Sequence, residues 1–507
     1  MSPVIVLAAL APLAWGEQVE LAHPANPSFA RSLQSPAPLA VGMRVGVRLA
    51  SRRCLEGDGW KLRLYPLGSL QGYEASIIGA RTADGCTREL DALLPHDIPM
   101  GVAEAVLTDS RDHSSEPQAV RLNPVQFALL HNAGRAMAQR MEGGRLQPLS
   151  LTAPARAGDR ILVRAAGLGR ARAEEVRLRL AQTRVRPLSV RAVAGEPGLE
   201  EIEFEMPANL SLLGCYVPLA TEVNGVEENV VSIPVAGAVG PCRHQLGLTE
   251  AQLLLLDTGG RIPLVEFLID RNFNLAVVSS GMAGSDLIAS STGHDQPPLQ
   301  SGCQVSRTTG GGVGDAVYYW EEQLADKLPL GDLELTSPDG SKENPRHERL
   351  GPIGVYFSPG GFGPRVPDPG GVWQLRASNG DASIDWRVRV PPEVQPEELD
   401  PAALLAEGGI QQVRWNGGDY LESEWMIFRL RRDNTASELV CAAPAPDGRM
   451  SVDIGRFLKI PSDAAQRPYL QMSVWRQAPL LSPLRIGGTD GVGITIGLGR
   501  SYTWVRR

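Results

Sequence analysis

Hydrophobic and polar residues alternate over several short stretches in the first half of the chain. In Val176–Leu180 the aliphatic residues alternate with arginines, and in Glu201–Glu205 they alternate with glutamates. A period of two places the two sets of side chains on opposite faces of a strand. Asn224-Gly225 predicts a hairpin turn between Thr221–Val223 and the later run Val230–Val235. These patterns predict short antiparallel strands with one buried face.

The pattern occurs twice, which indicates an internal repeat. Residues 40–50 (AVGMRVGVRLA) resemble residues 156–166 (RAGDRILVRAA), and Leu62–Leu64 corresponds to Leu178–Leu180. Residues 95–101 also match residues 207–214. In all three matches the second copy follows the first by 112–116 residues. Two tandem domains of about 100 residues follow, each an antiparallel sandwich of immunoglobulin type.

Three further segments set the remaining organisation. Phe127–Pro148 contains Ala and Met but is interrupted by glycines, so we expect one or two hairpins rather than a helix. Leu248–Leu256 predicts one short helix, with Thr249 as its N-cap and Gly259-Gly260 as its end. The Pro- and Gly-rich stretch Pro359–Gly371 is the best candidate boundary in the second half.

The expected fold class is therefore all-β, with tandem immunoglobulin-like β-sandwich domains followed by a β-rich C-terminal half. The expected divisions are a signal peptide at 1–16, the first immunoglobulin-like domain at 17–148, the second at 149–240, a β-rich domain with one short helix at 241–358, and a C-terminal β-sandwich at 372–507.

Composition agrees with this organisation, and the N-terminal sequence indicates the compartment of the protein. The chain has 507 residues, and its 55 glycines and 40 prolines exclude a long helical rod or bundle. Its net charge of −8 argues against a general nucleic-acid binder. An apolar stretch, Val4–Leu13, precedes the small-x-small site Ala14-Trp15-Gly16, which predicts a secretory signal peptide although no basic residue precedes the stretch. No other segment is apolar enough for a transmembrane helix, so a secreted protein, extracellular or periplasmic, is expected.

Six cysteines fit an oxidising compartment. None forms a C-x-x-C pair, so we expect disulfides rather than a metal site. Six cysteines allow fifteen connectivities, and the sequence alone does not choose among them. The domain interpretation favours pairs that close loops of about thirty residues, and elimination leaves the last pair. The pairs are Cys54–Cys86, Cys215–Cys242 and Cys303–Cys441.

Part of the chain resembles a known family. The matching pieces are Pro154–Asp159, Ala166–Gly169, Val223–Val226 and Asn229–Val235, with Gly134–Ala138 upstream and Leu246–Gly260 and Leu333–Gly340 downstream. They resemble secreted acidobacterial (Solibacter-type) proteins of unknown function with an immunoglobulin-like, IPT/TIG-related C-terminal domain. The resemblance covers about two thirds of the chain, on short, turn-like motifs. The arginine-rich strands depart from the family pattern, as does the missing basic start of the signal peptide. The family has no assigned catalytic residues, so the resemblance implies none here.

Several short motifs imitate catalytic or ligand sites. Asp257-Thr258-Gly259 resembles an aspartic-protease motif, but that chemistry needs a second carboxylate, and the segment is better explained as a helix end. Gly310–Gly314 lacks the Lys-Ser/Thr of a phosphate loop, and His347-Glu348 lacks a second histidine for zinc. Ser279–Gly281 and Ser291–His294 are most simply loop residues. No catalytic residue, cofactor or metal site is predicted.

Two broader features have both a structural and a functional explanation. Ten arginines lie between Arg156 and Arg191, close to the acidic run Glu200–Glu205. We expect Arg177 and Arg179 to pair with these glutamates if their strands are neighbours, which would neutralise the surface instead of forming an anion site. Six tryptophans beyond residue 370 either fill sandwich cores or stack on sugars, and core packing is favoured. They are Trp373, Trp386, Trp415, Trp425, Trp475 and Trp504.

These observations favour a non-catalytic secreted protein with an extracellular binding, adhesion or scaffold role, whose contacts are carried by the loops of the sandwiches. The partner is not identified by the sequence; an extracellular protein or a polysaccharide fits this role, and nucleic acid does not. The alternative is a secreted carbohydrate-binding or carbohydrate-active protein that uses the tryptophan-rich C-terminal half.

Overall fold

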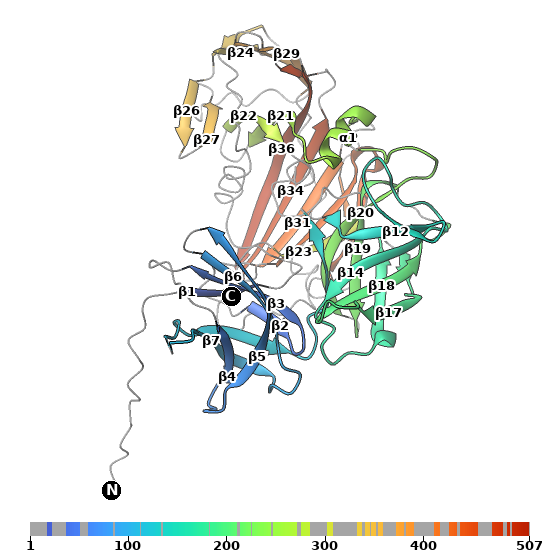
Figure 1. Ribbon diagram of the computed structural model, residues 1–507. Helices are drawn as coiled ribbons and strands as arrows, with labels where there is room; N and C mark the ends of the chain where they lie inside the picture. Colours follow the sequence, from blue (N-terminus) through green and yellow to red (C-terminus); the bar gives the residue numbers. More distant parts are fainter. Residues whose placement is uncertain are drawn as a thin grey trace.

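The computed structural model shows a chain built almost entirely of β-strands (Figure 1). It describes residues 18–22, 37–50, 59–84, 87–111, 113–132, 135–181, 183–209, 213–224, 226–244, 247–270, 275–283, 302–307, 332–336, 340–344, 346–350, 353–357, 372–379, 382–389, 410–415, 425–432, 437–454, 469–479, 484–486 and 489–505. The predicted signal peptide at 1–16 lies outside these residues. The all-β prediction is confirmed.

The first sandwich is one eight-stranded sheet that folds around its own core, in the order β1-β3-β6-β5-β4-β7-β8-β2. Its long strand β5 pairs with β4 near its start and with β6 over the rest, so β5 belongs to both layers. Alternating positions such as Leu62 and Leu64 point into the core and are fully buried. The strands are β1 Gln18–Ala22, β2 Ala37–Ala40, β3 Arg44–Ala50, β4 Lys61–Pro66, β5 Tyr73–Asp84, β6 Thr87–Leu93, β7 Gly101–Thr108 and β8 Gln118–Asn123.

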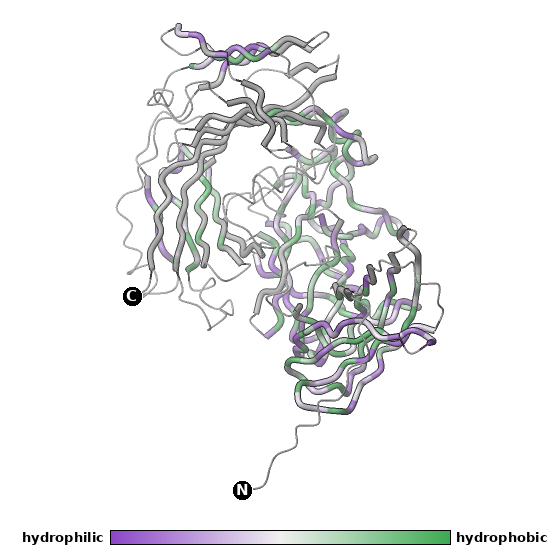
Figure 2. The backbone as a smooth tube through the Cα atoms, turned by 90° about the vertical axis from the view of Figure 1, so that its left-hand side faces the viewer, coloured by the Kyte–Doolittle hydropathy of each residue, from purple (hydrophilic) through white to green (hydrophobic). Residues whose placement is uncertain are grey.

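The second sandwich packs two sheets face to face, with the orders β10-β11-β20-β19-β15-β16 and β13-β12-β14-β18-β17, and β9 pairs with β14. Ile202, Phe204 and Val217 lie in its fully buried core. In Figure 2, hydrophobic and hydrophilic positions are interleaved along the coloured parts of the backbone. The strands are β9 Ala128–Leu129, β10 His131–Asn132, β11 Arg135–Ala136, β12 Ala138–Glu142, β13 Arg145–Pro148, β14 Arg160–Ala166, β15 Val176–Leu180, β16 Thr183–Val185, β17 Ser189–Ala192, β18 Leu199–Glu205, β19 Gly214–Val223 and β20 Val226–Val235.

The strand orders of the two sandwiches agree with the sequence repeat. The run β3-β6-β5-β4-β7-β8 of the first sandwich corresponds to β14-β18-β17 and β16-β15-β19-β20 of the second, with the long β5 replaced by two short strands. The glycines that precede β3 and β14, Gly42 and Gly158, have φ values of +72° and +81°. A residue with a Cβ rarely adopts this backbone, which explains why the repeat keeps glycine here.

The region between the repeats forms hairpins, as predicted. Strands β10 and β11 pair antiparallel, and so do β12 and β13. All four belong to the sheets of the second sandwich, so this sandwich begins directly after β8, well before the division expected at residue 148. The two sandwiches are thus joined by the short link Pro124–Gln126.

In the C-terminal half, the described residues form the predicted helix and three further sheets. Strands on both sides of Pro359–Gly371 pair in one ten-stranded sheet, because β21 lies beside β36 and β23 beside β32. Residues 359–371 themselves lie outside the described residues. The elements are α1 Glu250–Asp257, β21 Ile262–Asp270, β22 Leu275–Ala283, β23 Gly302–Arg307, β24 Asp332–Thr336, β25 Lys342–Glu343, β26 Arg346–Leu350, β27 Ile353–Phe357, β28 Val372–Asn379, β29 Ala382–Arg389, β30 Ile410–Arg414, β31 Trp425–Arg432, β32 Ser437–Pro444, β33 Arg449–Asp453, β34 Tyr469–Pro479, β35 Leu484–Ile486 and β36 Thr489–Val505; short 3-10 turns occupy Ala173–Glu175 and Ala445–Asp447.

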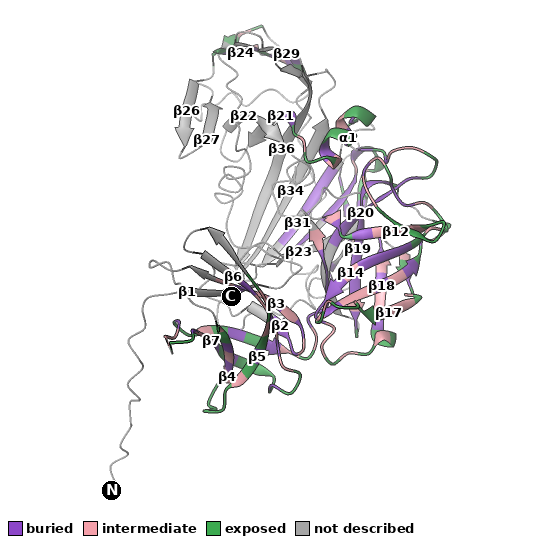
Figure 3. Cartoon of the chain, viewed as in Figure 1, coloured by how far each residue is buried: buried purple, intermediate pink, exposed green. Residues whose placement is uncertain are grey.

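Helix α1 has the ends that its sequence predicts. Thr249 is the N-cap and accepts a hydrogen bond from the Gln252 amide, while the Gln252 side chain reaches back to the Thr249 amide. The first backbone donors of a helix lack internal partners, and this reciprocal arrangement satisfies two of them. The helix ends at Asp257, and Gly259 follows in the left-handed region. Figure 3 shows that α1 exposes much of its surface beside the second sandwich.

Candidate functional site

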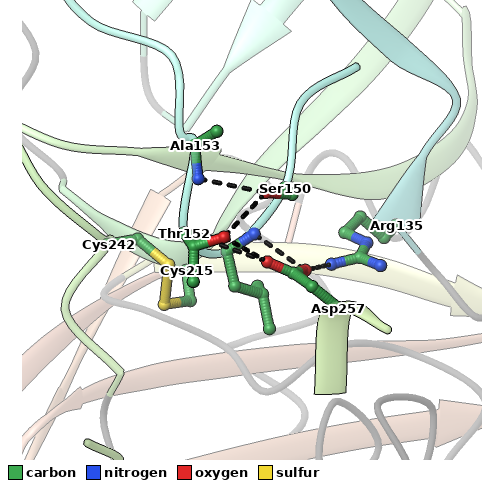
Figure 4. Close-up of a disulfide and its surroundings, with 8 residues drawn as sticks. Arg135, Ser150, Thr152, Ala153, Cys215, Cys242 and Asp257 are labelled. Atoms are coloured by element: carbon green, nitrogen blue, oxygen red, sulfur yellow. Dashed lines mark hydrogen bonds and ion pairs between the residues drawn. A yellow bond between two sulfur atoms is a disulfide. The ribbon is translucent and has the colours of Figure 1, made fainter. Parts of the chain in front are cut away.

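The protease-like motif places its aspartate at the end of α1, where the carboxylate binds the second sandwich. Asp257 Oδ1 lies 2.8 Å from Arg135 Nη1 of β11 and accepts a hydrogen bond from the Leu151 amide at 3.0 Å. Asp257 Oδ2 accepts hydrogen bonds from the amide and the hydroxyl of Thr152, both at 2.9 Å. Figure 4 shows these donors converging on the carboxylate. We call this arrangement the Asp257 clamp.

The donors of the clamp are held by a tight turn. The Ser150 and Ala153 backbones exchange two hydrogen bonds at 3.2 Å, and Ser150 Oγ accepts a further one from the Ala153 amide (Figure 4). This turn fixes the amides of Leu151 and Thr152 between its ends, so both can point at one carboxylate. Charge-assisted hydrogen bonds of this kind are roughly twice as strong as neutral ones.

The surroundings of Asp257 favour the ionised form of its carboxyl group. Its side chain is 8% exposed, and burial by itself raises the pKa of a carboxyl. The hydrogen bonds from Leu151, Thr152 and Arg135 outweigh that effect, so the pKa of Asp257 lies below its usual value. An aspartic-protease carboxyl shares a proton with a second carboxyl, whereas Asp257 is surrounded by donors. The geometry supports joining of modules and not acid catalysis.

A disulfide lies beside the clamp and fixes the same junction. Cys215, near the start of β19, is bridged to Cys242, as predicted. The amide of Cys242 donates to the Leu151 carbonyl at 2.9 Å, so the bridge and the clamp share the same turn. Next to the bridge, His244 is 3% exposed and its ring meets Tyr216 edge to face, with centroids 5.3 Å apart. Burial lowers the pKa of His244 to about 3, so this imidazole is neutral.

The other predicted cysteine pairs are described only in part. Cys441 is disulfide-bonded, and Cys303 is the residue directly opposite it in the register of β23 and β32. Cys54 and Cys86 lie outside the described residues.

The arginine-rich surface is neutralised by other partners than expected. Arg177 and Arg179 lie on β15, which belongs to a different sheet from the glutamates of β18, so the predicted pairing is wrong. Arginines of β14 and β17 flank β18 instead: Arg160 lies 3.0 Å from Glu203, and Arg191 lies 2.7 Å from Glu201. Nη1 of Arg177 donates hydrogen bonds to the carbonyls of Glu174 and Val176. An arginine patch that recognises anions receives no support from these contacts.

An Asp-His pair that the sequence analysis missed lies in the loop between β7 and β8. His113 Nδ1 is 3.0 Å from Asp109 Oδ2, and Asp109 Oδ1 accepts from the amides of Arg111 and His113. Burial raises the pKa of Asp109, but these hydrogen bonds outweigh it and the pKa is lowered. The adjacent Ser115 hydroxyl donates to the Glu116 carbonyl and accepts from the Leu107 amide, so it is held as part of the loop. The cluster therefore closes a hairpin.

The remaining candidates are buried or undescribed. Trp373, Trp386 and Trp415 are at most 5% exposed, which fits core packing and not sugar stacking. For Trp425, Trp475 and Trp504 only the backbone is described, as for His347-Glu348 and Ser279–Gly281, while Gly310–Gly314 and Ser291–His294 lie outside the described residues. Within the described part of the chain, no group of three or more His, Cys, Asp or Glu residues is arranged to hold a metal ion. No helix in that part is long and apolar enough to cross a membrane.

Sequence offers one signal for the role of Asp257. An acidic residue in the last turn of a helix is unfavourable next to the negative end of the helix dipole. Such a residue therefore indicates a partner outside the helix, although it does not identify Arg135 or the turn at Leu151.

Comparisons with known proteins assign no family. No family model matches the chain, and no curated protein matches it. Among solved structures, the Bacteroides ovatus mixed-linkage glucan utilization locus protein SGBP-B, in complex with a mixed-linkage heptasaccharide, is 11% identical, with a TM-score of 0.22 and coverage of 40% of this chain and 48% of that one. The surface layer protein SbsC, domains 4-9, is 11% identical, with a TM-score of 0.19 and coverage of 97% and 66%. A pullulanase of Anoxybacillus sp. LM18-11 complexed with maltotriose is 11% identical, with a TM-score of 0.14 and coverage of 40% and 28%. The chain thus spans about half the length of the first of these proteins, and TM-scores this low carry no argument about its ligand.

Proposed function

We propose that this chain is a non-catalytic extracellular protein with a binding, adhesion or scaffold role, in which tandem sandwiches hold their loops in a fixed arrangement. The observation that carries the proposal is the Asp257 clamp. Asp257, the carboxylate of the protease-like motif, is ion-paired with Arg135. It also accepts hydrogen bonds from two backbone amides and a hydroxyl of the second sandwich. A group engaged in this way stabilises a junction and has no capacity left for proton transfer.

Both junctions of the second sandwich support a rigid arrangement. At one end the clamp and the Cys215–Cys242 bridge fix helix α1 and the chain that follows. At the other end the link Pro124–Gln126 is tied to the loop after β14, through Gln126 N to Gly167 O and Arg170 N to Pro124 O, both at 2.9 Å. A scaffold protein benefits from such junctions because loops on rigid elements present contacts with little loss of conformational entropy.

The proposed compartment is outside the cytoplasm. A structural disulfide persists in oxidising environments, and the apolar Val4–Leu13 stretch fits export. The proposed partner is an extracellular protein or a polysaccharide. The burial of Trp373, Trp386 and Trp415 gives no support to a sugar-stacking surface at those three residues.

The test measures binding and turnover on the same immobilised ligands. The wild-type chain and Asp257→Asn are applied to an array of polysaccharides and extracellular proteins, and both retention and release of cleaved products are recorded. We expect retention without turnover for at least one ligand class. Turnover of any peptide or glycan by the wild-type chain would overturn the proposal, whether or not the turnover persists in Asp257→Asn.

A further inference from the structure

The two sandwiches meet where two glycines approach the first sandwich closely. A Cβ at Gly169 would overlap the Pro124 carbonyl oxygen, and a Cβ at Gly198 would lie 2.5 Å from the Arg44 amide nitrogen. Arg170 Nη2 also donates to the His96 carbonyl at 3.3 Å. The junction therefore consists of two segments of the second sandwich, the loop 167–170 and the turn 195–198, packed on the first.

Glu200 connects these two segments. It lies two residues after Gly198 on β18, in the same alternating row as Ile202 and Phe204, which are fully buried in the core. The backbone amide of Leu168, next to Gly169, donates a hydrogen bond to the Glu200 carboxyl. The second oxygen, Oε2, is buried and has no hydrogen-bond partner among the described residues. A carboxyl group thus joins both junction segments at the end of an apolar core.

The charged groups on the surrounding elements are engaged elsewhere. The residues opposite Glu200 on β14 and β17 are Ala165 and Ala192, which carry no charge. The nearby charged pairs are Arg164 with Glu196, Arg160 with Glu203, Arg191 with Glu201 and Arg44 with Asp91, and Arg170 donates to a carbonyl. Burial raises the pKa of Glu200 to about 7, and the Leu168 amide is the contribution that lowers it. An ionised Glu200 is therefore costly in this site.

We propose that Glu200 makes the junction between the two sandwiches sensitive to pH, closed when its carboxyl is protonated and loosened when it is ionised. Burial raises the folded-state pKa of Glu200 from its ordinary value of 4.5 to about 7. The contribution of the protonated group is fully present below pH 4.5 and is lost as the pH rises through about 7. Water stabilises the ionised carboxylate of Glu200 when the loop 167–170 and the turn 195–198 separate from the first sandwich. This device does not depend on the proposed function.

Hydrogen exchange of the full chain between pH 5 and pH 8.5 tests the proposal, after correction for the intrinsic rate at each pH. In the wild type, protection of the amides of residues 125, 126 and 167–170 should fall about tenfold between pH 6 and pH 8.5, beyond any change in β14. The Gln side chain of Glu200→Gln keeps an acceptor for the Leu168 amide but cannot ionise. Protection of the junction amides in this variant should therefore stay constant over the same pH range. Glu205→Gln, an exposed residue of the same strand, is the matched control and should follow the wild type.

Two results would overturn the proposal. One is a constant protection of the junction amides in the wild type from pH 5 to pH 8.5, which is decisive whether or not Glu200→Gln folds. The other is an equal loss of protection in the junction and in the core strand β14, which would assign Glu200 to the stability of the second sandwich alone.

Discussion

Arg135 and Asp257 are 122 residues apart in sequence, and their side chains form an ion pair of 2.8 Å between the second sandwich and the end of helix α1. Arg135 is 20% and Asp257 8% exposed, so water screens the pair only partly. The pair therefore reports directly on whether the two modules are docked.

Loss of the Asp257 carboxylate should destabilise this junction in a pH-dependent way. The pKa of Asp257 is lowered, so its contribution is present above its unfolded value of 3.8 and is lost as the pH falls below that. Asp257→Ala should lower the free energy of unfolding of the docked unit by about 3 kcal/mol at pH 7, because it leaves Arg135 and two amides without a partner. Chemical denaturation at pH 7 and pH 3 measures this. An equal loss at both pH values would contradict the ionised clamp.

Removal of the disulfide beside this turn should lower the free energy of unfolding, because the unfolded chain is then less constrained. The bridge joins Cys215 and Cys242 with a sequence separation of 27. Closing a loop of that length contributes about 3–4 kcal/mol in the chain-entropy model. The double variant Cys215→Ser/Cys242→Ser should show this loss in denaturant titrations under non-reducing conditions. A reducing agent is then added to both proteins. If it lowers the free energy of unfolding of the double variant as much as that of the wild type, another bridge is responsible for the effect of reduction.

The neutral, buried His244 should make the second sandwich sensitive to acid. Its folded pKa is lowered to about 3 from 6.5, so the stability it allows is present above pH 6.5 and is lost as the pH falls toward 3. The slope is about 1.4 kcal/mol per pH unit in this range. His244→Phe should flatten the pH dependence of unfolding between pH 6 and pH 4. An unchanged slope would mean that His244 is protonated in the folded protein.

Gly169 should tolerate no side chain at the junction of the two sandwiches. Its φ is +61° and a Cβ would overlap the Pro124 carbonyl oxygen. Gly144, in the β12–β13 hairpin, has a φ of +78° but nothing within 4 Å of a Cβ, so it carries the backbone cost alone. Gly169→Ala should therefore reduce hydrogen-exchange protection at Gln126 and Arg170, while Gly144→Ala leaves it unchanged. Equal protection in both variants would show that the junction is loosely packed.

Local patterns were sufficient to predict most of the fold in the first half. The alternation in Val176–Leu180, the repeated glycines Gly42 and Gly158, and the capped helix after Thr249 depend on residues close in sequence. Strand periodicity, turn conformation and helix capping are local effects, so a single sequence contains them. The repeat extended these predictions to two tandem domains of the same kind.

Non-local contacts account for what the sequence did not predict. Alternating arginines show that β15 is a strand but not which sheet it joins, and for that reason Arg177 and Arg179 were matched to the wrong glutamates. The role of Asp257 depends on a turn more than a hundred residues earlier in the chain. Glu200 looked like one acid in an exposed run, and only the fold shows that it lies in the row of Ile202 and Phe204.

A double-mutant cycle on Arg135 and Asp257 is the most direct test of the clamp on which this account rests. Wild type, Arg135→Met, Asp257→Asn and the double variant are compared by the free energy of unfolding of the docked unit at pH 7. We expect a coupling free energy of about 1.5 kcal/mol or more, because the ion pair is short and largely buried. A coupling free energy near zero, with the two single losses simply adding, would contradict the clamp.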